Sequence, residues 1–398
     1  MLKSIKIKNF CSIGEMQEIS FEITAKDVLN DSARQIDDGS YMNLVSCIVG
    51  HNASGKTTVL KAISFLFYFI QSSYTEAKAE QKIPIEPHKL KENEPTFIEI
   101  EFFNETDLYK YSIELNEKEV LKESLEKKSN RMIPIFKLVR EENNTEIETS
   151  LKLNKTDEER FKKRKNVSLL SSLINTGYLS DISFFKMFDT NVNQRGLLSH
   201  SSIRKCYTTS TALFADENLR KEVLDFTKNI DLGISDFSFF DVPKGDLAIE
   251  KDGRQQILQC IHKLKGNDFK LYLFEESNGT QHSFSILTDI LPILKTGGLV
   301  VLDEIESGLH PDVVRKIIFL FESKKTNPNN AQLIFSTHQH PLLNDRTKTQ
   351  IFLTEKSDST FETEIFRLDD IEGVRNDENY FHKYIAGAYG GKANINWI

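Results

Sequence analysis

The stretch Gly50–Thr57 holds the residues with the clearest chemical purpose. Its sequence, Gly-His-Asn-Ala-Ser-Gly-Lys-Thr, fits the pattern G-x-x-x-x-G-K-[ST] without a mismatch. The two glycines let backbone N–H groups wrap an anion at the positive end of a helix. We expect Lys56 to reach the β- and γ-phosphates of a nucleotide and the Thr57 hydroxyl to coordinate Mg²⁺. The residues predicted to line this phosphate site are Gly50, Asn52, Ser54, Gly55, Lys56, Thr57 and Thr58.

Two adjacent carboxylates follow the apolar run Leu299–Leu302. Placing Asp303 and Glu304 side by side at the end of a buried strand is costly unless a cation or a substrate uses them. In a P-loop enzyme, Asp303 would hold Mg²⁺ through its water shell, and Glu304 would orient and deprotonate the attacking water. In isolation, such a pair is also typical of a strand that ends in two solvated acids. The P-loop upstream favours the catalytic interpretation.

A third apolar run, Ala331–Ser336, is followed directly by Thr337 and His338. A histidine at this place is suited to hydrogen-bond the γ-phosphate and the attacking water, which would couple hydrolysis to closure of the site. On its own, a histidine there would more often be structural. Together with the two motifs above, it completes a predicted catalytic set of Glu304, Lys56 and His338.

The elements that position these side chains follow from hydrophobic periodicity. Residues 1–50 alternate as antiparallel strands do, and the apolar run 44–49 leads into the P-loop. The segment 56–70 has helical periodicity, and 97–115 predicts a hairpin with a polar turn. Short apolar runs at 298–302 and 332–336 suit a parallel sheet covered on both faces. Further helical stretches are expected at 155–176 and 216–230.

Composition excludes several classes of protein. The chain has 398 residues, and 51 Lys and Arg against 59 Asp and Glu give a net charge of −8. Because this balance excludes a uniformly basic surface, any DNA contact must be local. No apolar run approaches the roughly 20 residues of a membrane span, and four scattered cysteines indicate neither disulfides nor a zinc site. We expect a cytoplasmic protein without membrane contact, and interpret its 28 Phe against one Trp as compositional bias.

Together the motifs resemble those of ABC-type ATPases, in the AAA-labelled branch related to SMC, RecF and OLD (overcoming lysogenization defect) proteins. Gly50–Thr57 resembles the P-loop, Leu299–Glu304 the Walker B strand, Ser307–Pro311 the D-loop and Ser336–His338 the H-loop. The opening Ile5–Ile13 is similar to a hallmark of this branch. The closing Tyr384–Gly391 is similar to the tails of its stand-alone bacterial members, several of which belong to anti-phage systems such as PARIS and the Abi/Rlo loci.

The resemblance implies ATP and Mg²⁺ as cofactors and a head-to-head dimer, with ATP held between a P-loop and the signature motif of the opposing copy. The candidate signature is Glu276–Gln281, which departs from the usual Leu-Ser-Gly-Gly-Gln at Asn278 and Thr280. Ser277 and Gly279 can still offer a hydroxyl and a backbone N–H to the γ-phosphate in trans. A Ser/Asn/Gly loop before a helix also occurs without such a function.

Two other positions of the family stay open. Neither Gln71 nor Gln81 lies at a convincing strand end, so the Mg²⁺-sensing glutamine is unassigned. Cys11 stands where relatives often carry a basic residue near the nucleotide, which leaves recognition of the base and ribose open.

These observations predict an α/β protein: an ABC-type P-loop ATPase head, with an antiparallel β lobe and a parallel core, interrupted by an inserted, mainly helical region. Residues 1–115 would form the N-terminal lobe with the P-loop, and 116–245 the insertion. Residues 246–398 would form the C-terminal lobe with the signature, Walker B, D-loop and H-loop. The lack of a sustained heptad in 116–245 argues against a long coiled-coil arm.

The functional hypothesis is an oligomeric ATPase that acts as a sensor or scaffold switch in anti-phage defence and controls a separately encoded effector. The C-terminal part lacks the spaced acidic residues of a TOPRIM nuclease, so we expect a TOPRIM-like or other nuclease from the same operon as partner. The alternative is a RecF/SMC-like repair or recombination ATPase that binds DNA directly. A transporter subunit is a third, weaker hypothesis.

The basic run Lys162–Lys165 has two interpretations. It is a contact for DNA or a partner, or it is a solvated charged face, which its acidic neighbours favour. Tyr389 and Trp397 would either dock a partner or tuck onto the sheet.

Overall fold

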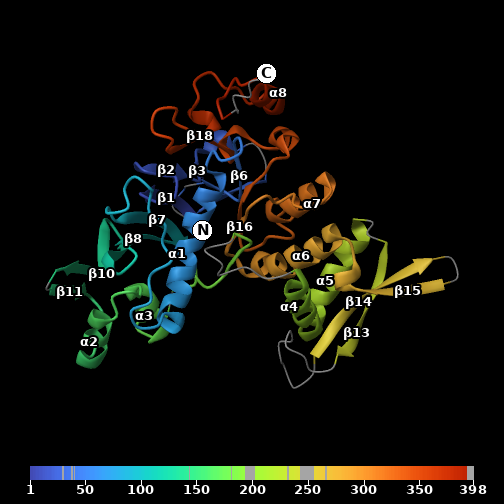
Figure 1. Cartoon of the computed structure of the whole chain (residues 1–398). Helices are drawn as coiled ribbons and strands as arrows, with labels where there is room; N and C mark the ends of the chain where they lie inside the picture. The colour runs from blue at the N-terminus through green and yellow to red at the C-terminus, as the bar shows by residue number, and fades with distance from the viewer. Residues whose placement is uncertain are drawn as a thin grey trace.

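The computed structural model describes residues 1–28, 31–36, 39, 41–142, 144–180, 182–192, 202–230, 233–242, 255–264 and 267–391. Trp397 lies outside these residues. Two large sheets organise the chain, an antiparallel one at the left of Figure 1 and a mainly parallel one beside it. A smaller unit, built from helices and a separate sheet between residues 202 and 272, lies at the right.

The parallel sheet carries the three predicted motifs at the ends of its strands. Its strand order is β12 (Phe188–Thr190), β16 (Leu299–Leu302), β17 (Gln332–Ser336), β6 (Val45–Val49), β18 (Ile351–Lys356) and β19 (Thr363–Arg367). The first five strands run parallel, and β19 is antiparallel to β18. Every residue of β6, β16 and β17 is buried, as in strands covered on both faces. Since parallel strands end at one edge, the loops after these strands converge there.

The antiparallel sheet is larger than the sequence indicated. Its order is β11 (Asn144–Thr149), β10 (Met132–Glu141), β9 (Val120–Lys128), β8 (Asp107–Leu115), β7 (Thr96–Asn104), β1 (Leu2–Lys8) and β2 (Gln17–Ser20). β7 and β8 form the predicted hairpin. The expectation of a mainly helical region from residue 116 is wrong for β9 to β11. Charged residues alternate there with buried ones because one face of the sheet is solvated, and the density of charge concealed the period of two.

Helix α1 (Lys56–Glu76) lies between the two sheets. One hydrophobic core joins its buried face to β1 and β7 of the antiparallel sheet and to β16 of the parallel sheet. Stacked aromatic rings fill part of this layer: Phe67 and Phe188 have centroids 4.3 Å apart, and Phe102 and Phe184 4.5 Å apart. The phenylalanine excess therefore has a structural use that composition did not reveal. α2 (Lys155–Lys163) and α3 (Leu169–Asn175) confirm the first predicted helical stretch.

A second core covers the opposite face of the parallel sheet. It includes α6 (Asn278–Thr296) and α7 (Pro311–Glu322), which pack against the strands that carry the motifs. Beyond α6 lie α4 (Ser202–Ala215), α5 (Glu217–Asn229) and a sheet of β13 (Ile234–Val242), β14 (Gln255–Leu264) and β15 (Asn267–Tyr272) (Figure 1). α5 confirms the second predicted helical stretch. The division of the chain into domains stays a prediction.

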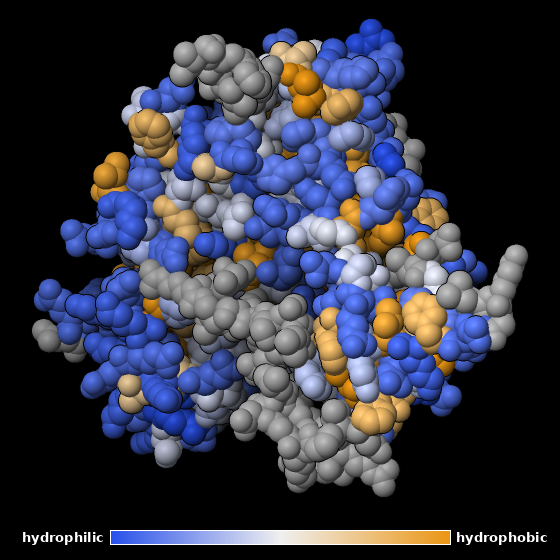
Figure 2. Space-filling view, turned by 45° about the vertical axis from the view of Figure 1, so that its right-hand side comes forward, coloured by the Kyte–Doolittle hydropathy of each residue, from blue (hydrophilic) through white to orange (hydrophobic). Residues whose placement is uncertain are grey.

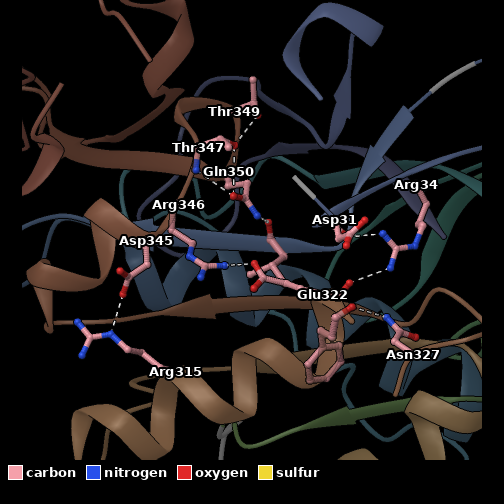
Figure 3. A network of polar contacts seen from close by, with 12 residues as sticks. Asp31, Arg34, Arg315, Glu322, Asn327, Asp345, Arg346, Thr347, Thr349 and Gln350 are labelled. Carbon is pink, nitrogen blue, oxygen red and sulfur yellow. Dashed lines mark hydrogen bonds and ion pairs between the residues drawn. The ribbon is translucent and has the colours of Figure 1, made fainter. Parts of the chain in front are cut away.

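A polar network fixes the segment that follows β17 (Figure 3). This segment is the short helix η3 (His340–Asp345), and Arg346 directly after it forms an ion pair with Glu322 at the end of α7. Arg315 Nε donates to Asp345 Oδ2 at 2.7 Å, which makes a second bridge between α7 and η3. Both contacts hold the chain in place close to the end of β17, where His338 lies.

The molecular surface is mainly polar in the view of Figure 2, where hydrophobic side chains lie in scattered patches. In the described part of the chain, none of the helices combines the length and the apolarity that crossing a membrane requires. The remaining described strands, β3 (Glu22–Ile23), β5 (Tyr41–Asn43) and β4 (Ala33–Gln35), form a small sheet of their own.

Candidate functional site

The loop between β6 and α1 depends on its two glycines. A Cβ on Gly50 would lie 2.4 Å from the carbonyl oxygen of Thr354, and one on Gly55 would lie 2.2 Å from Oγ1 of Thr363. Gly55 also has a φ of +112°, which few other residues adopt. Thr354 of β18 and Thr363 of β19 thus pack closely against the loop and leave no room for a side chain at either glycine. This close approach explains why the pattern requires glycine at both positions.

The hydroxyls of the loop face different ways. Ser54 Oγ is 2.6 Å from Thr354 Oγ1, and Thr58 Oγ1 is 2.8 Å from Ser12 Oγ. The Thr58 N–H donates to Gly55 O at 2.9 Å, within the first turn of the helix. Asn52 is exposed at the tip of the loop. Of the predicted phosphate-site residues, Ser54 and Thr58 therefore turn their side chains into the protein.

Lys56 is the first residue of α1, and its ammonium lies inside the loop. Its ammonium donates to the carbonyl oxygens of Gly50 at 2.9 Å and His51 at 3.1 Å, and only 6% of the residue is exposed. Burial lowers the pKa of Lys56, while the negative charges of Asp303 and Glu304 oppose the shift. A cation held by two neutral carbonyls in a partly desolvated loop is poised to bind phosphate oxygens instead.

Thr57 and Asp303 meet across the ends of β6 and β16. Thr57 Oγ1 donates to Asp303 Oδ2 at 2.8 Å, and Ser336 Oγ donates to Asp303 Oδ1 at 2.5 Å. A hydroxyl and a carboxylate are the hard oxygen donors that Mg²⁺ prefers, next to the loop that would hold its phosphate ligands. These two residues therefore fit the predicted metal, with Thr57 as a direct ligand and Asp303 as a partner of its water shell.

Glu304 and His338 face each other at the solvent side of this site. Their Oε1 and Nε2 atoms are 3.7 Å apart, and the side chains are 58% and 38% exposed. Glu304 has a left-handed φ of +48°, and its N–H donates to Ser336 Oγ at 2.8 Å. Such a strained backbone persists where the surroundings determine it. The carboxylate of Glu304 is thereby left exposed, next to His338.

Asn191 is a residue that sequence reasoning missed. It follows β12, and its side chain brackets the backbone of Asp303, accepting from the N–H at 2.7 Å and donating to the carbonyl at 2.8 Å. No pattern pointed to it, because a lone asparagine 112 residues away becomes meaningful only through the pairing of β12 with β16. The two glutamines considered from the sequence bond elsewhere: Gln71 donates to Phe185 O, and Gln81 accepts from Lys78 N.

Glu306 is a second residue that the motifs did not single out. Its carboxylate accepts from Thr337 Oγ1 at 2.7 Å and from the backbone N–H of His338. The loop after β16 thus holds the loop after β17. This contact fixes the position of His338 relative to Glu304.

Comparison with known proteins agrees with this geometry. A family model described as "AAA domain, putative AbiEii toxin, Type IV TA system" matches residues 45–345, which is more than half of the chain and spans the P-loop, the carboxylate pair and His338. The protein belongs to this AAA-domain family. No curated protein matches the chain.

Solved structures show the fold of this AAA-domain protein. The crystal structure of an SMC head bound to the C-terminal winged-helix domain of ScpA is similar with a TM-score of 0.50 and 12% identity, covering 93% of this chain and 98% of that one. The SMC head domain from Thermotoga maritima has a TM-score of 0.44 and 14% identity, covering 92% and 98%. The first of these likenesses confirms the predicted fold, an α/β head with an antiparallel lobe and a parallel core.

The candidate signature of the AAA-domain protein caps a helix. Ser277 precedes α6, and its Oγ accepts from the N–H of Thr280 at 3.2 Å. A Cβ on Gly279 would lie 2.4 Å from the carbonyl oxygen of Gly308, so the signature packs against the D-loop segment. Among the described residues, no hydrogen bond joins Ser277 or Gly279 to the P-loop of the same chain.

Proposed function

We propose that this protein binds ATP with Mg²⁺ and hydrolyses it. The observation that carries the proposal is the convergence of Lys56, Thr57, Asp303, Glu304 and His338 at the ends of three adjacent parallel strands. Each side chain has the chemistry that phosphoryl transfer to water needs. A P-loop kept only for structure would not require this combination.

The roles of the residues follow from their contacts. Lys56 would exchange its bonds to two loop carbonyls for bonds to phosphate oxygens. Thr57 and Asp303 would hold Mg²⁺, which when bound neutralises charge on the phosphates. The open carboxylate of Glu304 would accept the proton of the attacking water, and His338, 3.7 Å from it, would hydrogen-bond the γ-phosphate.

The proposed active form is a head-to-head dimer. Ser277 and Gly279 lie at the N-terminal end of α6, a 19-residue helix whose dipole favours an anion there. Among the described residues they do not bond the P-loop of their own chain, and the helix cap at Ser277 would contact ATP held by a second copy. ATP would then be an essential part of the interface, and hydrolysis would open it.

We further propose that this cycle serves anti-phage defence, with the protein as an oligomeric sensor or scaffold in the cytoplasm that controls a separately encoded effector, such as a nuclease. The family description, which names a toxin of a type IV toxin–antitoxin system, supports a role in such conflict systems. The net charge of −8 favours a protein over DNA as the main macromolecular partner.

The basic run also favours a protein partner. Lys162 pairs with Glu158 at 2.6 Å, and Lys165 pairs with Glu119 at 3.1 Å. Arg164 donates to the backbone carbonyls of Tyr74 and Ala77. Cations that are already paired have less charge to offer to DNA phosphates. The RecF/SMC-like alternative, with direct DNA binding, remains a prediction of the sequence.

Phosphate release from MgATP tests the proposed activity. We expect steady hydrolysis by the wild type and a loss of at least about a hundredfold in Lys56→Ala, because the variant lacks the cation that binds the β- and γ-phosphates. Lys61→Ala, on the same helix, is the matched control and should hydrolyse ATP normally. An equal rate in Lys56→Ala and the wild type would refute the proposal.

The same variants separate the biological alternatives. In cells that carry the whole operon, the defence role predicts that the wild type lowers phage plating and Lys56→Ala restores it. ATP-stimulated DNA binding that weakens with salt would instead support the repair alternative.

A further inference from the structure

The last described residues return to the nucleotide loop. Residues 379–391, called here the C-terminal clasp, comprise α8 (Tyr380–Ile385) and a turn that ends at Gly391. The carbonyl oxygen of Gly391 accepts two hydrogen bonds, from the N–H of His51 at 3.0 Å and from the hydroxyl of Tyr384 at 3.1 Å. The N–H of Gly391 donates to Glu355 Oε2 at 3.1 Å, at the end of β18. The clasp therefore contacts the P-loop itself at its second residue.

Two glycines make this contact feasible. Gly390 and Gly391 have φ values of +75° and +67°, in the left-handed region. A Cβ on Gly390 would lie 2.7 Å from Oε2 of Glu355, the oxygen that accepts from Gly391. Gly390 and Gly391, the last two residues of the clasp, thus let the turn approach β18 closely enough to reach His51.

The other side of the clasp contacts the segment that follows His338. The ring of Tyr384 packs against His340 with centroids 4.8 Å apart, and the N–H of Phe381 donates to Asn344 Oδ1 at 3.0 Å. Both partners belong to η3, which α7 anchors through the network of Figure 3. The clasp is thus built against a fixed support on one side and the P-loop on the other.

Tyr384 lies at the junction of these contacts and is only 4% exposed. Burial raises its pKa to about 12, so the hydroxyl stays protonated and donates at physiological pH. His51, the residue at the far end of this chain of bonds, supplies one of the two carbonyl oxygens that hold the ammonium of Lys56. Hydrogen bonds to the carbonyl of Gly391 therefore link Tyr384 to the backbone of His51, and the carbonyl of His51 links it to Lys56.

We propose that the C-terminal clasp pre-forms the P-loop, with Tyr384 as a positioning residue for nucleotide binding. The inference rests on the proposed function. With the clasp docked, the loop that presents Lys56 is held in its binding shape before the nucleotide arrives, which lowers the ordering cost of binding. Because coupling between two sites is reciprocal, a bound nucleotide also stabilises the docked clasp.

Nucleotide affinity of Tyr384→Phe tests the clasp, with Tyr380→Phe as its matched control. Tyr380 lies on the same helix and is also buried, but its hydroxyl donates to Arg375 O and not toward the P-loop. We expect the dissociation constants of MgADP and MgATP, and KM for ATP, to rise about threefold to tenfold in Tyr384→Phe, as for the loss of one hydrogen bond. kcat should stay within about twofold of the wild type, because no group that touches the γ-phosphate changes.

Amide hydrogen exchange gives an independent readout on the unmodified protein. MgADP should slow exchange of residues 384–391 in the wild type and slow it less in Tyr384→Phe. If the circular dichroism of Tyr384→Phe differs from that of the wild type, Gly390→Ala takes its place, with the same expected loss of affinity. The proposal for the clasp is overturned if the folded variant binds nucleotide as tightly as the wild type. It is also overturned if MgADP does not change amide exchange in the clasp. A wild type that binds no nucleotide overturns the proposed function instead.

Discussion

At the scale of single residues, the backbone around Asp303 and Glu304 is held by side chains that take no part in the proposed reaction. Asn191 brackets the peptide groups of Asp303, and Ser336 accepts from the N–H of Glu304 while donating to the carboxylate of Asp303. With these contacts in place, Glu304 can keep its left-handed conformation and its outward direction. The geometry of the proposed base therefore depends on an asparagine from a neighbouring strand.

Replacing Asn191 tests this dependence. Asn191→Ala removes both bonds to Asp303, so we expect kcat for ATP hydrolysis to fall about tenfold or more. The affinity for ADP without Mg²⁺ should change little, because Lys56 and its loop are untouched. Asn229→Ala is the control, since that side chain bonds only Asp225 O within α5. A normal kcat in Asn191→Ala would show that Glu304 is positioned without it.

The parts of the site that the sequence predicts are those formed by residues close together in the chain. The parts formed by residues far apart in the chain were missed. The P-loop and the carboxylate pair were visible in the sequence because each is a contiguous pattern with its own chemistry. Asn191 and the clasp were not visible as site elements, because their partners lie 112 residues away for Asn191 and more than 300 for Gly391. Such contacts depend on strand order, which single-residue patterns do not encode.

At the scale of elements, the interface between β12 and α6 brings together two partly buried carboxyl groups. Phe188 packs against Phe67 on the α1 side of β12, so the next residue, Asp189, points to the opposite face, which α6 covers. Burial and the charge of Asp189 raise the pKa of Asp289 on α6 to about 7. Lys205 of α4 opposes that shift, and burial raises the pKa of Asp189 as well. β12, which precedes Asn191, and α6, which Ser277 caps, thus contact each other through carboxyl groups with raised pKa values.

This contact predicts how stability depends on pH. The pKa of Asp289 is about 7 in the folded protein and 3.8 as its ordinary value, so the folded state binds the extra proton between these limits. The contribution of Asp289 to the free energy of unfolding is therefore largest below about pH 4 and falls as the pH rises to about 7. Asp289→Asn should flatten this decline and be more stable than the wild type above about pH 7. Urea denaturation across this range measures it.

Asp225→Asn on the exposed face of α5 serves as the control and should follow the wild type throughout. A profile of Asp289→Asn that runs parallel to that of the wild type would mean that the carboxyl titrates normally. His282, on the same face of α6, contributes little charge in this range, because burial lowers its pKa to about 4.

Helices and strands were predicted correctly where the buried residues of a segment recur at a clear helical or strand spacing, or form one short apolar run. The helix after the P-loop, the hairpin 97–115 and the buried strands 299–302 and 332–336 all have strong short-range patterns. The strands β9 to β11 did not, because lysine and glutamate occupy the solvated face so densely that the buried positions are few. The sheet that they extend exists through pairing with β8, a feature of the assembled fold.

At the scale of the whole molecule, the proposed reaction needs two half-sites, and within the described part of the chain no hydrogen bond joins them. The P-loop with its acidic pair forms one, and the helix cap at Ser277 with Gly279 forms the other. A two-fold arrangement would complete both at once, since each copy would supply what the other lacks. Under this account nucleotide, assembly and hydrolysis are one coupled process, and blocking the chemistry must leave the assembled form to accumulate.

The molar mass of Glu304→Gln in solution tests that account most directly. The substitution keeps the shape of the side chain and removes the proposed base, so ATP should bind without being hydrolysed. Light scattering coupled to gel filtration should show the mass of the variant doubling when MgATP is added, returning to the starting value with MgADP, while the wild type shifts only transiently. A Glu304→Gln protein that binds MgATP and keeps the same mass with and without it would contradict the shared-site dimer.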